Sequence, residues 1–175
     1  MSLITKLNNP LTPEYQQFKR AIKQDNFIWG HAGADYNDGS NPAYFSHPFI
    51  LRPDDGSHYP RSICDHTQHV KRMVEHILAH NRIELQLIYR MNLNMTYAQD
   101  GNQQTPIHVD HEFEHQNLLI YLSTHKEGDG GQLIVEDEEY YPTEDDVVMF
   151  DGLPHSTILP KKGFRTALVT TFLSK

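Results

Sequence analysis

Residues 103–116, QQTPIHVDHEFEHQ, place histidines among acidic side chains. Imidazole nitrogens and carboxylate oxygens are common metal ligands in proteins. His108 and Asp110 are two positions apart, so on an extended strand both side chains point to the same side. A chain with 12 histidines and many aspartates contains such a pair by chance. The pair is therefore meaningful only if a third ligand comes from elsewhere in the chain.

Residues 146–172, DVVMFDGLPHSTILPKKGFRTALVTTF, supply a third candidate in His155. It follows an apolar run and the turn at residues 151–154. Two histidines and one carboxylate form the facial triad of non-haem Fe(II) oxygenases, which leaves open coordination positions. Those positions would accept a chelating cosubstrate and O2. The sequence thus predicts a metal site made of His108, Asp110 and His155.

Arg165 lies ten residues after His155 and begins the last apolar run of the chain. On a strand it alternates with Ala167, Val169 and Thr171, so we expect it to point into a core. An unpaired buried charge is costly, and a guanidinium suits a carboxylate through two parallel hydrogen bonds. The spacing predicts that Arg165 binds an anion near the metal.

The elements that must position these residues are mostly strands. Residues 85–97, LQLIYRMNLNMTY, have an apolar or aromatic side chain at every odd position, which predicts a long strand with one covered face. Short helices are expected from Thr12-Pro13 to about residue 24, and from a cap at Ser62 or Asp65 to about residue 80. Turn residues separate the other expected strands, at 44–51, 106–110, 117–123, 132–136, 146–150, 156–159 and 165–172. This pattern favours a β-sandwich or barrel.

Composition narrows the class of protein. The length of 175 residues favours a single domain, and the net charge of −8 disfavours a general nucleic-acid binder. Cys64 is the only cysteine, so no internal disulfide forms. We see no signal peptide and no run of about 18 apolar residues that would span a membrane. We expect a soluble, cytoplasmic protein with no membrane partner; its oligomeric state stays open.

The run from His108-Val109-Asp110 through NLLIYLS, GDGGQLIVE and DVVMFDGLPHSTILPKKGFRTALV resembles the Fe(II)/2-oxoglutarate-dependent dioxygenase superfamily. The likeness is to its prolyl-hydroxylase-like branch and covers roughly residues 85–173. It implies a double-stranded β-helix, or jelly roll. We therefore expect a mainly β, α+β domain over residues 1–175, with a helical and loop-rich support at 1–82 and a jelly-roll catalytic core at 83–175.

The resemblance also implies roles for single residues. His108, Asp110 and His155 match the iron ligands, and Arg165 matches the residue that binds the distal carboxylate of 2-oxoglutarate. Three further positions match the cosubstrate pocket: Tyr121 as a hydrogen-bond donor to the same carboxylate, Leu119 as an apolar lining residue, and Tyr97 as a tyrosine near the cosubstrate or substrate. Gly130-Gly131 matches the turn that enters the next strand. The implied cofactors are Fe(II) and the cosubstrate 2-oxoglutarate, with ascorbate as reductant.

The substrate is the open part of this interpretation. The branch favours a peptidyl proline or another protein side chain, but a small molecule and a nucleobase also stay open. Ala167 replaces a hydroxyl residue found in some branches, and His111 replaces an asparagine frequent in prolyl hydroxylases. Loops near a barrel mouth set specificity, so we expect substrate contacts from residues 34–62 and 98–106.

Two other classes of function remain. A cupin-like protein could hold a metal in the same fold without 2-oxoglutarate chemistry, but it would not need Arg165 with Tyr121. A structural module that has lost its metal is the other alternative, and the complete set of three ligands argues against it.

Overall fold

A computed structural model gives the fold and describes residues 2–32, 42–51, 61, 62, 64–100 and 103–175. Within these residues the chain is mainly antiparallel β-sheet with two α-helices. The elements in order are β1 (Thr5–Leu7), α1 (Pro13–Ala21), β2 (Gly30–Ala32), β3 (Tyr44–Leu51), β4 (Arg61–Ser62), α2 (Thr67–His80), β5 (Leu85–Tyr97), β6 (Gln116–Tyr121), β7 (Leu133–Val135), β8 (Glu138–Tyr140), β9 (Val147–Asp151), β10 (His155–Thr157) and β11 (Phe164–Ser174). None of the described helices is long and apolar enough to cross a membrane.

Helix α1 begins where the sequence predicts. The Thr12 hydroxyl accepts a hydrogen bond from the Tyr15 backbone N–H at 3.3 Å, and Pro13 occupies the first turn, where its missing N–H is harmless. The helix ends at Ala21, three residues earlier than expected, although turn-type hydrogen bonds continue to Phe27. Tyr15 and Phe18 form its buried face.

Helix α2 has the expected amphipathic face but a different start. It begins at Thr67 with His66 as the N-cap, and no side chain caps it. The expected caps, Ser62 and Asp65, are therefore wrong. The Cys64 carbonyl instead accepts from the Thr67 N–H at 3.0 Å. The buried apolar face is the predicted one: Val70, Met73, Val74, Ile77 and Leu78.

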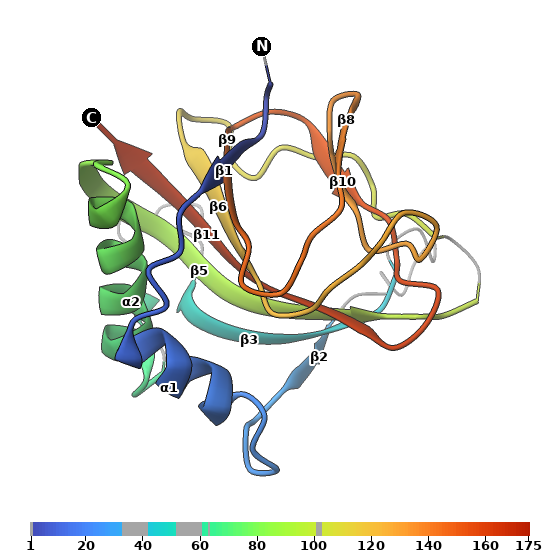
Figure 1. Cartoon of the computed structure of the whole chain (residues 1–175), viewed down its shortest axis with the longest axis horizontal. Helices are drawn as coiled ribbons and strands as arrows, with labels where there is room; N and C mark the ends of the chain where they lie inside the picture. The colour runs from blue at the N-terminus through green and yellow to red at the C-terminus, as the bar shows by residue number, and fades with distance from the viewer. Residues whose placement is uncertain (1, 33–41, 52–60, 63, 101–102) are drawn as a thin grey trace.

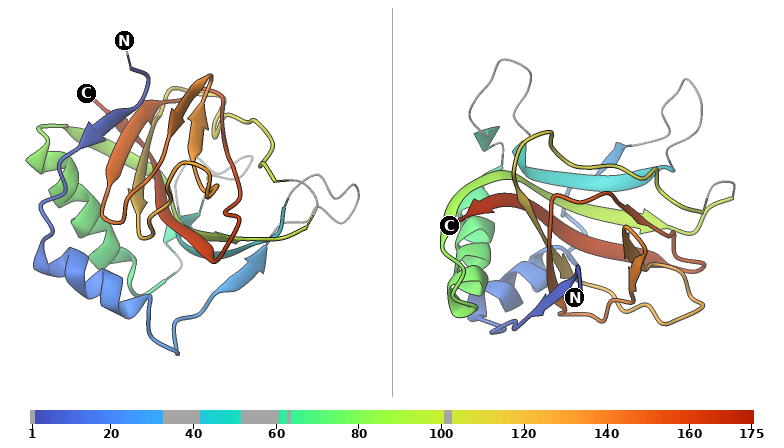
Figure 2. Two further views of the ribbon diagram at one scale, coloured as in Figure 1. Left: turned by 45° about the vertical axis from the view of Figure 1, so that its right-hand side comes forward. Right: turned by 90° about the horizontal axis from the view of Figure 1, so that it is seen from above.

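The strands form two antiparallel sheets. The large sheet has eight strands in the order β1-β9-β6-β11-β5-β3-β2, with β4 paired to β3. The small sheet has the order β10-β7-β8. Both helices lie on one side of the large sheet, and β8 and β10 lie on the other side (Figure 1). The same arrangement is visible in the two further views (Figure 2).

Each face of the large sheet covers its own apolar cluster. The outer cluster joins the sheet to the helices and includes Met91, Leu93, Leu118 and Leu168. The inner cluster lies between the two sheets and consists of Ile4, Leu119, Tyr121, Leu133, Val135, Val148, Phe150 and Ala167. Neighbouring residues such as Leu118 and Leu119 belong to different clusters, because successive side chains of a strand alternate between faces. A sheet buried on both sides can place polar side chains inside the protein.

Most expected strands are present, with shifts of one or two residues at their ends. The expected strand at 106–110 is wrong: this segment makes one isolated bridge, His108 to His155, and a second bridge, Gln104 to Ile158, lies just before it. The strand β8 was not expected; it pairs with β7 and makes the acidic run at 136–139 a hairpin. Short strands β1, β2 and β4 were also not expected, because two or three residues carry too little periodicity to be recognised.

The strand β5 departs from the alternation that its sequence suggests. Met91 and Leu93 lie in the outer cluster as expected, but Leu87 is 41% exposed and Ile88 is buried. The pairing with β11 shifts between Thr171 and Phe172, so one extra residue of β5 is inserted beside this point. Such a bulge reverses the phase of the strand. The opposite face, expected to be solvated, is covered: Asn92 and Thr96 are buried.

Candidate metal centre

The three predicted ligands come from two segments that backbone hydrogen bonds join. The His108 N–H donates to the His155 carbonyl at 3.0 Å, and the His155 N–H donates to the His108 carbonyl at 2.9 Å. His155 is the first residue of β10, and His108 lies in the segment between β5 and β6. The two imidazole rings are 4.5 Å apart between centroids. This pairing brings together residues 47 positions apart in the sequence.

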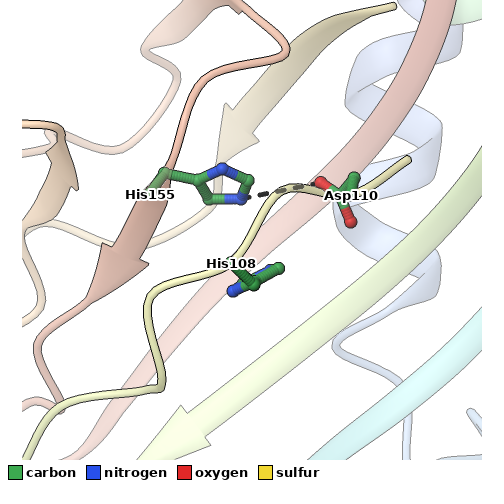
Figure 3. A group of neighbouring side chains, drawn as sticks. All are labelled: His108, Asp110 and His155. Carbon is green, nitrogen blue, oxygen red and sulfur yellow. Dashed lines mark ion pairs between the residues drawn. The ribbon is translucent and has the colours of Figure 1, made fainter. Parts of the chain in front are cut away.

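Asp110 completes the group. One ligand atom each from His108, Asp110 and His155 lie within 4.8 Å of one another, a spacing that could hold a metal ion. Asp110 Oδ2 is 3.5 Å from His155 Nε2, and the His108 ring lies beside them (Figure 3). Asp110 is buried whereas His108 is exposed, so the group lies where the protein interior meets solvent. Two histidines and one carboxylate are the donor set that suits Fe(II) with open positions.

Both histidines present the nitrogen that a metal would need. His108 Nδ1 lies 2.9 Å from the Pro106 carbonyl, and His155 Nδ1 lies 2.9 Å from the Leu153 carbonyl. A carbonyl can only accept, so each Nδ1 carries the hydrogen and donates it. Nε2 of each ring is then the lone-pair nitrogen, and the ring orientation is fixed by the carbonyl, as is usual for metal-binding histidines.

The surroundings of His155 favour its neutral form. Burial lowers the pKa of His155, and the neighbouring His108 and His115 act in the same direction. The Leu153 carbonyl and Asp110 oppose this shift without reversing it. The ring also packs edge-on against Phe150 of the inner cluster, at 5.1 Å between centroids. A metal binds the neutral imidazole, so the lowered pKa keeps His155 ready to bind at neutral pH.

Arg90 is a member of this site that sequence reasoning missed. It lies on the face of β5 that was expected to be solvated, yet Arg90 Nη1 donates to Asp110 Oδ1 at 3.0 Å. The Asp110 side chain is 2% exposed and that of Arg90 is 19% exposed. The sequence shows that Arg90, Asn92 and Asn94 alternate with apolar residues. It does not show that their face of the sheet is covered, which is what brings Arg90 to Asp110.

Arg165 is buried, as predicted, with 4% of its surface exposed. Its Nε donates to the Gly131 carbonyl at 2.8 Å, and its Nη2 donates to the Tyr121 hydroxyl oxygen at 3.4 Å. Among the described residues, no carboxylate forms an ion pair with this guanidinium. A buried guanidinium held by neutral groups has the charge and the geometry to bind a carboxylate.

Tyr121 and Leu119 belong to the inner cluster, which also contains Phe150, the neighbour of His155. Tyr121 is fully buried, and its ring lies 5.2 Å from the Arg165 guanidinium carbon. Burial raises the pKa of Tyr121, so the phenol stays protonated. Because its oxygen accepts from Arg165, its O–H hydrogen can still donate to another group. Tyr121 thus contacts Arg165 directly, and Leu119 lies two positions earlier in β6.

Tyr97 does not join this group. In the pairing of β11 with β5, Arg165 is opposite Thr96, and Tyr97 is opposite Phe164. Paired residues share a face, so Tyr97 points away from the Arg165 side, and its ring contacts Phe45 at 5.7 Å. Thr96 takes the position near Arg165, and its buried hydroxyl has no hydrogen-bond partner among the described residues. Thr96 is thus a buried polar residue opposite Arg165 that the sequence did not reveal.

His111 and His115, which follow the ligands His108 and Asp110 proposed from the sequence, are buried. His111 Nε2 lies 2.8 Å from the Thr171 hydroxyl, and His115 Nδ1 lies 2.8 Å from the Phe113 carbonyl. The His115 ring fits against Gly152, where a Cβ would come within 2.6 Å of it. Both histidines therefore pack the segment that carries the ligands. Much of 34–62 and part of 98–106, the expected substrate contacts, lie outside the described residues.

Known proteins match this chain in fold but not in sequence. No protein-family model matches the chain, and no curated protein sequence matches it. Solved structures do match. A 2OG-Fe(II) oxygenase family oxidoreductase from Burkholderia pseudomallei superposes with a TM-score of 0.68 at 13% identity, over 97% of this chain and 84% of that chain.

Two prolyl hydroxylases match over almost the whole chain. The enzyme from Trichoplax adhaerens, solved with a hypoxia-inducible factor peptide fragment, gives a TM-score of 0.62 at 15% identity, over 98% of this chain and 83% of that chain. The viral collagen prolyl hydroxylase of Paramecium bursaria Chlorella virus 1 gives 0.58 at 12% identity, over 97% and 95%. The likeness that the sequence motifs indicate is therefore confirmed for the fold: this chain has the fold of 2OG-Fe(II) oxygenases, prolyl hydroxylases among them.

Proposed function

We propose that this protein is an Fe(II)- and 2-oxoglutarate-dependent dioxygenase that hydroxylates an organic substrate. One observation carries the proposal. Two histidines and a carboxylate converge within 4.8 Å, and the inner cluster packed against His155 contains the tyrosine that contacts a buried Arg165. The metal group alone would also suit a cupin-like protein. A buried guanidinium, connected to that group through Tyr121 and the inner cluster, is the feature that a dicarboxylate cosubstrate requires.

In this proposal the chain's own residues have separate tasks. His108, Asp110 and His155 hold Fe(II), with Nε2 of both rings kept free by carbonyl acceptors on Nδ1. Arg165 binds the distal carboxylate of 2-oxoglutarate and Tyr121 donates to it, while the Leu119 side chain keeps water from the pocket wall. The bound iron and cosubstrate supply the oxidising chemistry, in which O2 and 2-oxoglutarate give succinate, CO2 and a hydroxylated product.

We also propose that the two sheets form the jelly roll of the family and that the substrate is a peptidyl proline or another protein side chain. Support for the substrate comes from the prolyl hydroxylases among the structural neighbours, one of them solved with a peptide. The exposed side of the metal group supports access for a large substrate, since His108 is exposed and the adjacent Ile107 and Val109 side chains are exposed as well. A small molecule is the alternative substrate.

The test is succinate formation from 2-oxoglutarate with Fe(II), ascorbate and air, because such turnover can proceed without the substrate. Wild-type protein should form succinate and His108→Ala should not. His76→Ala is the matched control, since it removes an exposed histidine of α2. If wild-type protein forms no succinate, anaerobic titration of 2-oxoglutarate into the Fe(II)-loaded protein follows. Absence of binding there would overturn the proposal in favour of a cupin-like metal protein.

A further inference from the structure

The two oxygens of the Asp110 carboxylate have different neighbours. Oδ1 accepts from Arg90 Nη1 at 3.0 Å, and Oδ2 faces His155 Nε2 at 3.5 Å. The carboxylate is almost completely buried, so these contacts rather than solvent fix its orientation. A carboxylate can bind a metal through one oxygen or through both. The group that holds Oδ1 therefore influences how many oxygens face the metal.

The fold holds Arg90 in place. Arg90 lies in β5, which has a neighbour on each side, β11 and β3. It is opposite Thr171, immediately before the shift in register that separates it from Ile88. Ile88 and Met91 both lie in the outer cluster although they are three positions apart, which a regular strand does not allow. The bulge reconciles them and leaves Arg90 on the inner face with Asn92.

The number of metal-binding oxygens matters for the reaction. Two histidines and a one-oxygen carboxylate leave three positions of an octahedral metal open, two for 2-oxoglutarate and one for O2. A two-oxygen carboxylate would leave too few. We infer that Arg90 is a positioning residue that holds Asp110 Oδ1 and limits Asp110 to one metal-binding oxygen; this inference rests on the proposed function.

A merely structural ion pair would be the simpler role for Arg90. It would balance a buried charge, and its loss would lower stability without changing the properties of the folded, metal-loaded site. The two roles differ in what they predict for cosubstrate binding. Only the positioning role predicts that a folded and metal-saturated variant binds 2-oxoglutarate more weakly.

The experiment uses Co(II) as the probe metal, without O2, on wild-type protein, Arg90→Met, Arg90→Lys and Arg72→Met. Arg72 is an exposed arginine of α2 and serves as the matched control. Circular dichroism and thermal unfolding check folding. Isothermal titration then gives the affinity for Co(II), and a second titration gives the affinity of the Co(II)-saturated protein for 2-oxoglutarate. The visible absorption of Co(II) reports its coordination before the cosubstrate is added.

We expect Arg90→Met to bind Co(II) about 10- to 100-fold more weakly, which is the usual effect of removing a group that orients a metal ligand. At saturating Co(II) it should bind 2-oxoglutarate at least about tenfold more weakly than wild-type protein, with a changed Co(II) spectrum. Arg90→Lys should show a smaller fall in the same direction, because an ammonium keeps the charge without the fixed fork of the guanidinium. Arg72→Met should match wild-type protein.

Unchanged 2-oxoglutarate affinity in folded, Co(II)-saturated Arg90→Met would overturn the inference. If Arg90→Met does not fold, unchanged affinity in Arg90→Lys overturns it instead. The proposed function fails by a different result, namely wild-type Co(II) protein that does not bind 2-oxoglutarate. In that case the Co(II) affinities still test whether Arg90 orders Asp110. Equal Co(II) affinity in wild-type protein and in folded Arg90→Met would contradict that ordering.

Discussion

At the scale of single residues, one local arrangement recurs in three histidines. His108, His115 and His155 each place Nδ1 on the carbonyl two residues earlier, at 2.8 to 2.9 Å. The arrangement fixes the tautomer of all three but does not make all three ligands. His115 Nε2 is buried against Gly152, with no hydrogen-bond partner among the described residues, whereas His108 and His155 face each other. Local geometry prepares an imidazole for metal binding, and its surroundings decide whether it binds.

Arg165 and Tyr121 allow a graded test of cosubstrate binding. Arg165→Met should raise the KM for 2-oxoglutarate about 10- to 100-fold, since a hydrogen bond to a charged group contributes about 1.5–3 kcal/mol. Tyr121→Phe removes one hydrogen bond to the carboxylate but leaves the guanidinium charge in place, so it should raise the KM less, by about tenfold, which corresponds to about 1.5 kcal/mol. Succinate formation at varied 2-oxoglutarate measures both. A larger effect of Tyr121→Phe than of Arg165→Met would contradict the assigned roles.

At the scale of elements, the turn before β7 connects the fold to Arg165. Gly131 has a φ of +85°, and its carbonyl accepts from Arg165 Nε. The His125 ring lies against it so closely that a Cβ would come within 2.4 Å of His125 Cγ. Burial lowers the pKa of His125, and the Arg165 charge lowers it further, so the ring packs in its neutral form. Glycine is therefore needed here for two reasons, the backbone conformation and the contact.

A pair of glycines in this turn separates the two reasons. Gly128 has a φ of +87° with no described atom within 4 Å of its would-be Cβ, so Gly128→Ala adds backbone strain alone, about 1–2 kcal/mol. Gly131→Ala adds the same strain and a collision, for about 1–3 kcal/mol more. Urea unfolding measures both free energies. The added substitution His125→Ala should recover part of the Gly131→Ala loss, and equal effects of the two glycine variants would refute the importance of the contact.

At the scale of the whole molecule, distant parts of the chain share one sheet. Strands β1 and β3, from the first 82 residues, pair with β9 and β5 of the later part, and β2 and β4 pair with β3. The division into a support at 1–82 and a core at 83–175 stays a prediction, and the shared sheet joins the two parts closely. The three candidate metal ligands likewise come from separate segments, the one before β6 and the start of β10. A bound metal would connect these segments, so its binding should stabilise the entire fold.

Metal binding should therefore raise the melting temperature. At 100 times its Kd a ligand that binds only the folded state adds about 2.7 kcal/mol, or about 5–10 °C for a protein of this size. Differential scanning calorimetry with Mn(II) measures the shift, and a chelator should reverse it. Asp110→Asn should lose most of the shift, whereas Asp25→Asn, at an exposed position after α1, should retain it. A shift of equal size in both variants would place the metal elsewhere.

The sequence by itself determined the types of the candidate site residues and the periodic patterns that predict strands and helices. The His-x-Asp pair, His155 and Arg165 were identified from spacing and from resemblance, and the long strands and the N-cap of α1 follow from patterns within a few residues. These features are predictable because they depend on groups close together along the chain. The placement of His108, Asp110 and His155 in one group agrees with the prediction, while the roles of these residues and of Arg165 in binding iron and cosubstrate remain proposals.

The tertiary structure alone decided which face of each strand meets the site. The register of β5 with β11 places Arg90 and Thr96 on the face of the sheet that carries the site and Tyr97 on the other face, whereas the alternation of residues 85–97 predicts only that one face is covered. Register depends on hydrogen bonds between strands far apart in the sequence, and a shift by one residue exchanges the two faces. The sequence of β5 does not show which part of the chain packs against its polar face. Arg90 and Thr96 could therefore be recognised near the site only in the folded chain.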